Sequence, residues 1–200
     1  MLFMGNFKPP IVETERLLLR LLTPDIYNAV FQSYTNEALM HFFGFYSNEE
    51  LIIEKQKYAA GWTTHKIAFR MFHLIEKATG NVIGLCGFHT WYTHHFRAEI
   101  GYHLNDESKK GKGFMKEAIA PIIKYGFDEM HLNRIEALVG TDNVPSLKLL
   151  KGFGQPNSGI LPFGDFNKKA FFISLTERVR LGDQENNDQR KLNLFKEIYQ

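Results

Sequence analysis

Residues 98–130 constrain the fold more than any other stretch, because they join a strand, a basic glycine-containing turn and a long helix. Ala98–Leu104 predicts the strand, Lys109–Phe114 contains lysines and two glycines, and a helical pattern runs from Gly113 to Met130. Backbone N–H groups at a helix N-terminus lack intrahelical partners and carry partial positive charge, and glycine lets them approach an anion. The stretch therefore predicts a phosphate-binding turn.

The glycine spacing excludes two common nucleotide-binding loops. Gly111-Lys112-Gly113-Phe114 lacks the Gly-x-x-x-x-Gly-Lys-Ser/Thr spacing of a Walker A loop. No third glycine follows Gly113 at the distance that the dinucleotide-binding fingerprint requires. Taken alone, this Gly-x-Gly also fits a solvated, lysine-rich turn that caps an ordinary helix.

Length and composition fit one globular domain. The chain has 200 residues, of which 44% are hydrophobic and 23% charged. We expect a single domain over residues 1–176 and a polar tail over 177–200, with a short amphipathic helix at Leu192–Tyr199. The net charge of +2 is too small for a nucleic-acid-binding protein, so an anion site must be local.

The single cysteine and the N-terminus bear on where the protein acts. Cys86 lies in the apolar run Val82–Phe88 and has no second cysteine to pair with, so we expect a buried structural thiol. Met1–Met4 is too short for a signal sequence and lacks a basic flank, and no window reaches the length of a membrane span. These features predict a cytoplasmic protein that does not bind a membrane, and the small net charge predicts no nucleic-acid partner.

Helix and strand patterns follow one another in an order typical of a mixed α/β fold. Thr23 and Ser47 are predicted helix caps, the latter with Glu50 in a capping box, and Pro121 should kink the long helix. The predicted helices are Thr23–Tyr34, Asn36–Phe43, Ser47–Ala60, Gly113–Met130 and a short one that starts at Asp142–Ser146 and closes at Gly152. The predicted strands are Thr14–Leu21, Lys66–Ile75, Val82–Trp91, Ala98–Leu104, Arg134–Gly140 and Ala170–Leu175.

Four stretches together resemble the GNAT N-acetyltransferases, most closely the branch that acetylates the N-termini of ribosomal proteins. They are Ala98–Gly101, Gly111–Ala118, Leu132–Ala137, and Asn143 with Ser146. The resemblance covers about Glu13 to Thr176, and Ser108 departs from it by standing where the branch usually has Arg or Gln. It implies an α/β (α+β mixed) GNAT fold, whose central, mostly antiparallel sheet splays apart between flanking helices.

The resemblance also implies acetyl-CoA as co-substrate and assigns residues to it. Backbone donors of the turn would hold the pyrophosphate. The lysines of the turn would complement the negative charge of the pyrophosphate. The pantetheine arm would lie along the strand, where a backbone N–H near Tyr102–Leu104 polarises the thioester carbonyl. The implied cofactor-binding residues are Tyr102, Leu104, Lys109, Lys110, Gly111, Lys112, Gly113, Phe114 and Asn143.

Amine acetylation needs a group that removes a proton from the amine. Glu99 stands where several GNAT enzymes carry a catalytic glutamate, so the resemblance makes it the first candidate base; the alternative is an ion pair with Arg97 or a lysine. His103 shares its face of the strand if no bulge intervenes, and a histidine near neutral pKa suits the same task. An exposed histidine without a catalytic role is the alternative for His103.

Ser146 is the candidate acid for the leaving thiolate, because relatives of this branch place a serine there near the cofactor sulfur. The alternative is that Asn143 and Ser146 are ordinary helix-cap residues. Relatives outside the branch place a tyrosine acid further along this helix, where Leu149 and Leu150 exclude it. The family usually has two more residues before Gly152-Phe153, so the helix should end early.

His89, His94 and His95 do not form a standard metal-ligand pattern, and no cysteine joins them. We predict no metal site and expect loop histidines near an acceptor groove. Phe42–Tyr46 and Tyr92–Arg97 would line the acceptor side by resemblance, although Phe42–Tyr46 could equally be core.

The predicted function is direct, acetyl-CoA-dependent transfer to a primary amine in a ternary complex. The acceptor is a protein N-terminus or a small-molecule amine, and the sequence does not decide between them. The alternative is a catalytically weak CoA-binding or interaction module, which the shortened helix favours. We expect a monomer or a homodimer.

Overall fold

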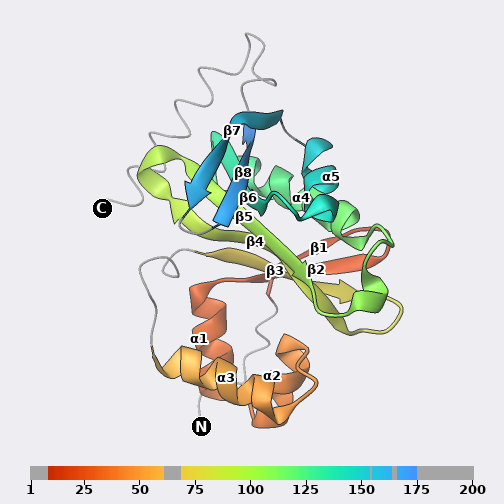
Figure 1. Cartoon of the computed structure of the whole chain (residues 1–200). Coiled ribbons are helices and arrows are strands. Elements are labelled where there is room, and N and C mark those ends of the chain that lie inside the picture. Colours follow the sequence, from red (N-terminus) through yellow and green to blue (C-terminus); the bar gives the residue numbers. More distant parts are fainter. Residues whose placement is uncertain (1–8, 61–68, 154, 164–165, 175–200) are drawn as a thin grey trace. The chain divides into compact units, whose positions relative to one another are not determined.

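The structure is a computed structural model that describes residues 9–60, 69–153, 155–163 and 166–174. Its residues group into two compact units. The first contains residues up to Trp91 together with Ile100–Ile122, and the second contains Tyr92–Glu99 together with residues from Ile123 onward. The fold is mixed α/β with a mostly antiparallel open sheet and flanking helices, as predicted (Figure 1).

The first unit holds an antiparallel meander. β1 to β4 pair in chain order, and the later part of β5 lies beside β4. The strands are β1 (Ile11–Glu13), β2 (Leu17–Leu22), β3 (Arg70–Glu76), β4 (Val82–Tyr92) and β5 (Arg97–Leu104). Leu17, Leu19 and Leu74 are completely buried, so β2 and β3 contribute side chains to the hydrophobic core. Cys86 is also buried, as predicted, and burial raises the pKa of its thiol.

The predicted strand Thr14–Leu21 corresponds to β2 but starts three residues too early, and β1 was not predicted. Thr14 N donates to Leu17 O at 2.9 Å, and Leu17 N donates to Thr14 Oγ1 at 3.1 Å. These bonds make a tight turn that separates β1 from β2. The predicted start of the next strand, Lys66, lies outside the described residues, and β3 begins at Arg70.

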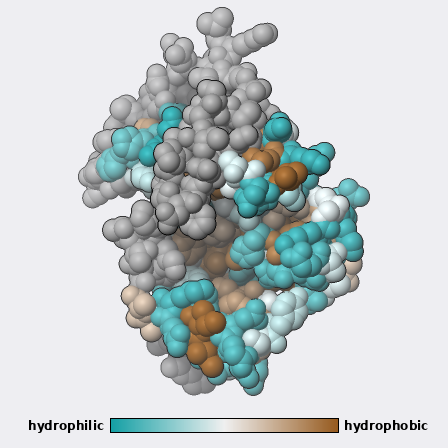
Figure 2. Space-filling model, viewed as in Figure 1, coloured by the Kyte–Doolittle hydropathy of each residue, from teal (hydrophilic) through white to brown (hydrophobic). Residues whose placement is uncertain are grey.

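Among the described residues, three helices precede β3, and the first and third have the predicted caps. They are α1 (Pro24–Ser33), α2 (Asn36–Phe43) and α3 (Asn48–Ala59). Thr23 Oγ1 accepts from Ile26 N at 3.3 Å, and Ser47 with Glu50 forms the capping box. Figure 2 shows a hydrophobic patch bordered by hydrophilic residues in the region of α2 and α3, and the exposed large apolar residues of α3 are Ile52 and Ile53.

Aromatic rings fill the space between these helices and β3. Phe42 and Phe43 are 5% and 7% exposed and their rings meet edge to face, which makes them core residues rather than a groove wall. Tyr46 is 69% exposed. Other rings of this cluster include Tyr27, Phe31, Tyr34, Phe45, Tyr58 and Phe69.

A cation and a buried histidine pack against these rings. The Arg20 guanidinium stacks on Phe42 at 4.0 Å from the ring centroid, donates to Phe42 O, and lies 3.0 Å from His73 Nδ1. Since Nδ1 accepts from the guanidinium, the ring proton belongs on Nε2. Burial, with the nearby Arg20 charge, lowers the pKa of His73 to about 3.

The second unit is built on the parallel pairing of β5 with β6 (Arg134–Gly140). This pairing joins Arg97–Glu99 to Arg134–Glu136. β6 continues against β8 (Phe166–Ser174), which pairs with β7 (Gln155–Phe163). α5 (Val144–Lys151) follows β6, and α4 (Phe114–Asp128) begins in the first unit and ends in the second.

β7 was not predicted, and β8 starts earlier than the predicted Ala170. Pro156 and Pro162 cannot donate ladder hydrogen bonds, and the register shifts between Pro156 and Ile160. These prolines interrupt the alternation that identifies a strand. The predicted tail over 177–200 lies outside the described residues.

The long helix α4 continues through Pro121 without a break. Ala118, Ile119 and Ile122 form its buried face, as predicted from their spacing. The expected kink at Pro121 stays a prediction. Within the described ranges, no helix combines the length and apolar character needed to cross a membrane.

The neutral state of His73 predicts acid sensitivity. Its folded pKa is below its unfolded value of about 6.5, so the unfolded chain binds the proton first and the free energy of unfolding falls as pH drops from 6.5 towards 3. The slope from this group approaches about 1.4 kcal/mol per pH unit. Denaturant unfolding at pH 7, 6 and 5 should show this loss, and His73→Phe should flatten it.

The exposed His41 provides the matched control. His41→Phe should leave the pH profile of stability parallel to the wild type. Identical profiles for the wild type and His73→Phe would contradict a buried, neutral His73.

Candidate functional site

The predicted phosphate-binding turn has the backbone of an anion-binding loop. A short 3₁₀ helix, Glu107–Lys109, leads into it, and α4 begins at Phe114. Gly111 and Gly113 have φ of 73° and 83°. A side chain is strained in this left-handed region, so both positions require glycine. Two such residues reverse the chain at the N-terminus of α4, where backbone donors are free of intrahelical partners.

Ser108, the departure from the family pattern, has a local role. Ser108 N donates to Asp106 Oδ1 at 2.7 Å, and its hydroxyl donates to Asp106 Oδ2 at 2.6 Å. These bonds lower the pKa of the Asp106 carboxyl. Ser108 therefore holds the entry to the loop and remains compatible with the predicted turn.

Two of the loop lysines face carboxylates. Lys109 Nζ donates to both carboxylate oxygens of Glu76, at 2.8 and 2.7 Å, and Lys110 pairs with Glu107. Hydrogen bonds from Lys109 and Thr79 lower the pKa of Glu76. The Lys109 charge is therefore compensated at the end of β3.

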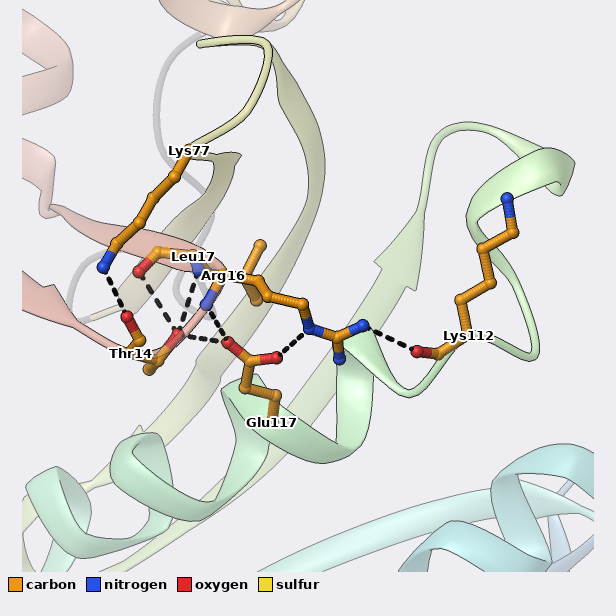
Figure 3. Close-up of polar contacts among 6 residues, drawn as sticks. All are labelled: Thr14, Arg16, Leu17, Lys77, Lys112 and Glu117. Atoms are coloured by element: carbon orange, nitrogen blue, oxygen red, sulfur yellow. Dashed lines mark hydrogen bonds and ion pairs between the residues drawn. The ribbon is translucent and has the colours of Figure 1, made fainter.

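Arg16 was not predicted as a site residue, although it lies within the Glu13–Thr176 stretch that the resemblance covers. Its backbone N and Nε donate to Glu117 Oε1 and Oε2, each at 2.7 Å, and one terminal nitrogen donates to Lys112 O at 3.0 Å (Figure 3). Thr14 Oγ1 donates to the same Glu117 Oε1 at 2.6 Å. Sequence spacing gave no signal for this contact, because 101 residues separate Arg16 from Glu117.

β5 carries the predicted pantetheine residues. Tyr102 and Leu104 are half-buried and His103 is exposed. Although the residue as a whole is exposed, partial desolvation of the imidazole lowers the pKa of His103, and a hydrogen bond with Asn105 opposes this shift. A neutral imidazole at pH 7 can accept a proton.

His89 lies over the strand that carries these residues. A Cβ at Gly101 would come within 2.7 Å of His89 Cδ2, so the glycine makes room for the imidazole. His94 and His95 lie in a 3₁₀ turn, Thr93–His95. In the part of the chain that the structure describes, His, Cys, Asp and Glu side chains form no group suited to a metal ion.

In the second unit, Glu99 and Glu136 are opposite each other in the parallel pair β5–β6. Arg97 Nη1 donates to Glu136 Oε2 at 2.7 Å, and Arg134 pairs with the same carboxylate. Arg97 is thus held by Glu136, and the alternative for Glu99, an ion pair with Arg97 or a lysine, stays a prediction. Glu99 itself is half-buried.

Asn143 caps α5, as the helix-cap interpretation of this residue predicted. Its Oδ1 accepts from Ser146 N at 3.2 Å, and Ser146 is partly exposed in the first turn. The helix ends at Lys151, early as predicted, and Leu150 is completely buried.

The candidate site residues are divided between the two units. His103 and the loop lie in the first unit, and Glu99, Asn143 and Ser146 lie in the second. Their convergence on one thioester stays a prediction.

Comparison with known families decides the assignment. Residues 16–155 match the family described as Acetyltransferase (GNAT) domain. This chain belongs to the GNAT acetyltransferase family. It is therefore an acetyltransferase, as predicted, and GNAT enzymes use acetyl-CoA as co-substrate.

Curated relatives agree with the GNAT assignment. The chain is 36% identical over 155 residues to the uncharacterized N-acetyltransferase YoaA of Bacillus subtilis (strain 168), covering 76% of this chain and 86% of that protein. It is 47% identical over 117 residues to the uncharacterized N-acetyltransferase p20 of Bacillus licheniformis, covering 56% and 64%.

Solved structures share the GNAT fold. A putative ribosomal-protein-serine acetyltransferase from Vibrio cholerae aligns with a TM-score of 0.55 at 24% identity, covering 84% of this chain and 98% of that chain. A chimera of the Vibrio cholerae spermidine N-acetyltransferase SpeG with hSSAT aligns with a TM-score of 0.57 at 22% identity, covering 82% and 98%.

The loop geometry predicts that Gly111→Ala weakens CoA binding. Its φ of 73° is nearly that of Gly80, at 72°, and a Cβ added at either glycine would have no atom within 4 Å. Alanine at either site should therefore cost a similar free energy of unfolding, about 1 kcal/mol. Calorimetric titration with CoA should show weaker binding for Gly111→Ala only.

Gly80 lies in the β3–β4 turn and serves as the matched control. Equal losses of CoA affinity in both variants would mean that backbone strain acts through general stability. Unchanged affinity in both would contradict a role for the loop in CoA binding.

Proposed function

We propose that this GNAT enzyme transfers the acetyl group of acetyl-CoA directly to a primary amine within a ternary complex. The observation that carries the proposal is the loop, whose two positive-φ glycines lead into the N-terminus of α4. This backbone suits a pyrophosphate, since its N–H groups and the helix dipole favour an anion.

Each candidate has a role in this reaction. Backbone groups of the loop from Lys109 to Phe114 hold the pyrophosphate, and Tyr102–Leu104 with Asn143 hold the pantetheine arm. Asn143 keeps its side-chain N–H₂ for this purpose, because its cap to Ser146 uses only the amide oxygen. A backbone N–H near Tyr102–Leu104 stabilises the oxyanion that forms at the thioester carbonyl.

The reaction requires two proton transfers. The neutral amine attacks the carbonyl carbon, a C–N bond forms and the C–S bond breaks. Glu99, directly or through a water, takes the proton lost by the amine. The Ser146 hydroxyl protonates the leaving thiolate and regains its proton from water, so the serine is restored. His103 is the second candidate base, because its lowered pKa leaves the imidazole neutral at pH 7.

The acceptor is a protein N-terminal α-amine or a small-molecule amine. The structural neighbours include a protein named for ribosomal-protein serine and one named for spermidine, so both classes belong in the test. The short helix α5, which ends at Lys151, favours the alternative of a catalytically weak CoA-binding module.

The test is release of free CoA thiol with ribosomal-protein N-terminal peptides, polyamines and aminoglycosides as acceptors. Glu99→Gln and Ser146→Ala should each lower kcat about a hundredfold or more, the range for a lost general acid or base, with little change in the KM for acetyl-CoA. Glu129→Gln, an exposed carboxylate after α4, is the control and should retain full activity.

Three results would change the assignment. Full activity of Glu99→Gln would move the base to His103 or to a relayed water. CoA binding without turnover on any acceptor would support the binding-module alternative. Absence of CoA binding by the wild type would contradict the proposed function.

A further inference from the structure

We propose that Arg16 and Glu117 are positioning residues that hold the pyrophosphate loop in its binding conformation before acetyl-CoA arrives. With Thr14 they form a contact that we call the loop clamp. The inference rests on the proposed function, because it concerns the same loop. Residues outside the loop thereby contribute to the affinity for acetyl-CoA.

The loop clamp joins three segments of the first unit. Arg16 lies in the turn between β1 and β2, Glu117 in the first turns of α4, and Lys112 between the two positive-φ glycines. Arg16 makes its three bonds to the Glu117 carboxylate and to Lys112 O with separate nitrogens (Figure 3). The loop and the start of the helix are therefore fixed by one residue.

The bond to Lys112 O also orients an N–H group. The described chain contains no cis peptide bond, so the Lys112–Gly113 peptide is trans and its C=O and N–H point in opposite directions. Arg16 holds the carbonyl, and the N–H of Gly113 consequently faces away from Arg16. The clamp thus leaves a loop donor free for the pyrophosphate without reorganisation on binding.

A second contact holds the other end of the loop. Lys109 is bound by both oxygens of Glu76, whose Oε2 also accepts from Thr79 Oγ1 at 2.8 Å. Glu76 is 8% exposed. The loop is anchored at Lys109 and at Lys112, with Gly111 between them.

Because Glu117 carries a charge, the direction in which CoA affinity changes on its replacement tests the proposal. Burial raises the pKa of Glu117, but hydrogen bonds from Thr14 and Arg16 outweigh it and the pKa is lowered, so the side chain is ionised at neutral pH. A carboxylate beside an anion site repels the anion. If charge alone mattered, Glu117→Gln would bind CoA more tightly; if Glu117 positions the loop, the variant binds CoA more weakly.

The experiment is calorimetric titration of CoA into the wild type, Glu117→Gln, Arg16→Lys and Glu107→Gln. We expect Glu117→Gln and Arg16→Lys to weaken CoA binding about tenfold, or about 1.4 kcal/mol. Arg16→Lys keeps the positive charge but loses the planar set of donors, so a loss of CoA affinity in this variant cannot be a charge effect. Glu107→Gln removes an 85% exposed carboxylate near the loop and should bind CoA as tightly as the wild type or more tightly.

Pantetheine gives the second readout, because it lacks the pyrophosphate. Its affinity, measured by NMR shift perturbation, should be the same in the wild type and both clamp variants. A general loss of structure would weaken pantetheine and CoA together and would overturn the positioning role.

The outcomes separate the two proposals. If the wild type does not bind CoA, the proposed function fails. If the wild type binds CoA and Glu117→Gln binds it equally well or more tightly, the loop clamp alone is overturned. If Glu117→Gln does not fold, Arg16→Lys decides in the same way.

Discussion

The contact between Arg16 and Glu117 is the constraint on which the candidate site most depends. A guanidinium can bind a carboxylate and a carbonyl at once in a single plane, which an ammonium cannot do. Here it connects the β1–β2 turn, the loop and the first turns of α4. Glu117 is 15% exposed at its side chain, so removing its partner would leave a poorly solvated charge. The loop conformation is consequently tied to the stability of the first unit.

The same unit contains a second, partly buried cation, Arg20, which has different interaction partners. Arg20 faces an aromatic ring, a carbonyl and a neutral histidine instead of a carboxylate. Burial lowers the pKa of Arg20 to about 10, which leaves it charged at neutral pH. Arg16 directly precedes β2 and belongs to the loop clamp, whereas Arg20 lies within β2 and belongs to the aromatic core. The short strand therefore links the core to the site.

Local signals predicted most of the first unit and the loop. Caps at Thr23 and Ser47 placed α1 and α3, and the spacing of Gly111 and Gly113 placed the anion-binding turn. These features depend on neighbouring residues, so the sequence contains them directly. The two glycines are the clearest case, because only glycine adopts their φ angles without strain.

Features that depend on distant residues could not be predicted. The loop clamp joins residues 101 positions apart and the Lys109–Glu76 contact joins residues 33 apart, and neither spacing has a pattern. β7 was missed because two prolines interrupt its alternation. Asn143 shows a different limit, since a helix cap and a pantetheine ligand have the same sequence signature and the structure shows the cap.

The pairing of charges around the loop has a consequence for selectivity. Arg16, Lys109 and Lys110 each face a carboxylate, namely Glu117, Glu76 and Glu107. The fields of these three pairs largely cancel beyond a few ångströms. The loop therefore attracts distant polyanions such as RNA less strongly than its number of basic residues suggests. Backbone N–H groups, which act only at contact, then contribute a larger share of the binding of the nucleotide.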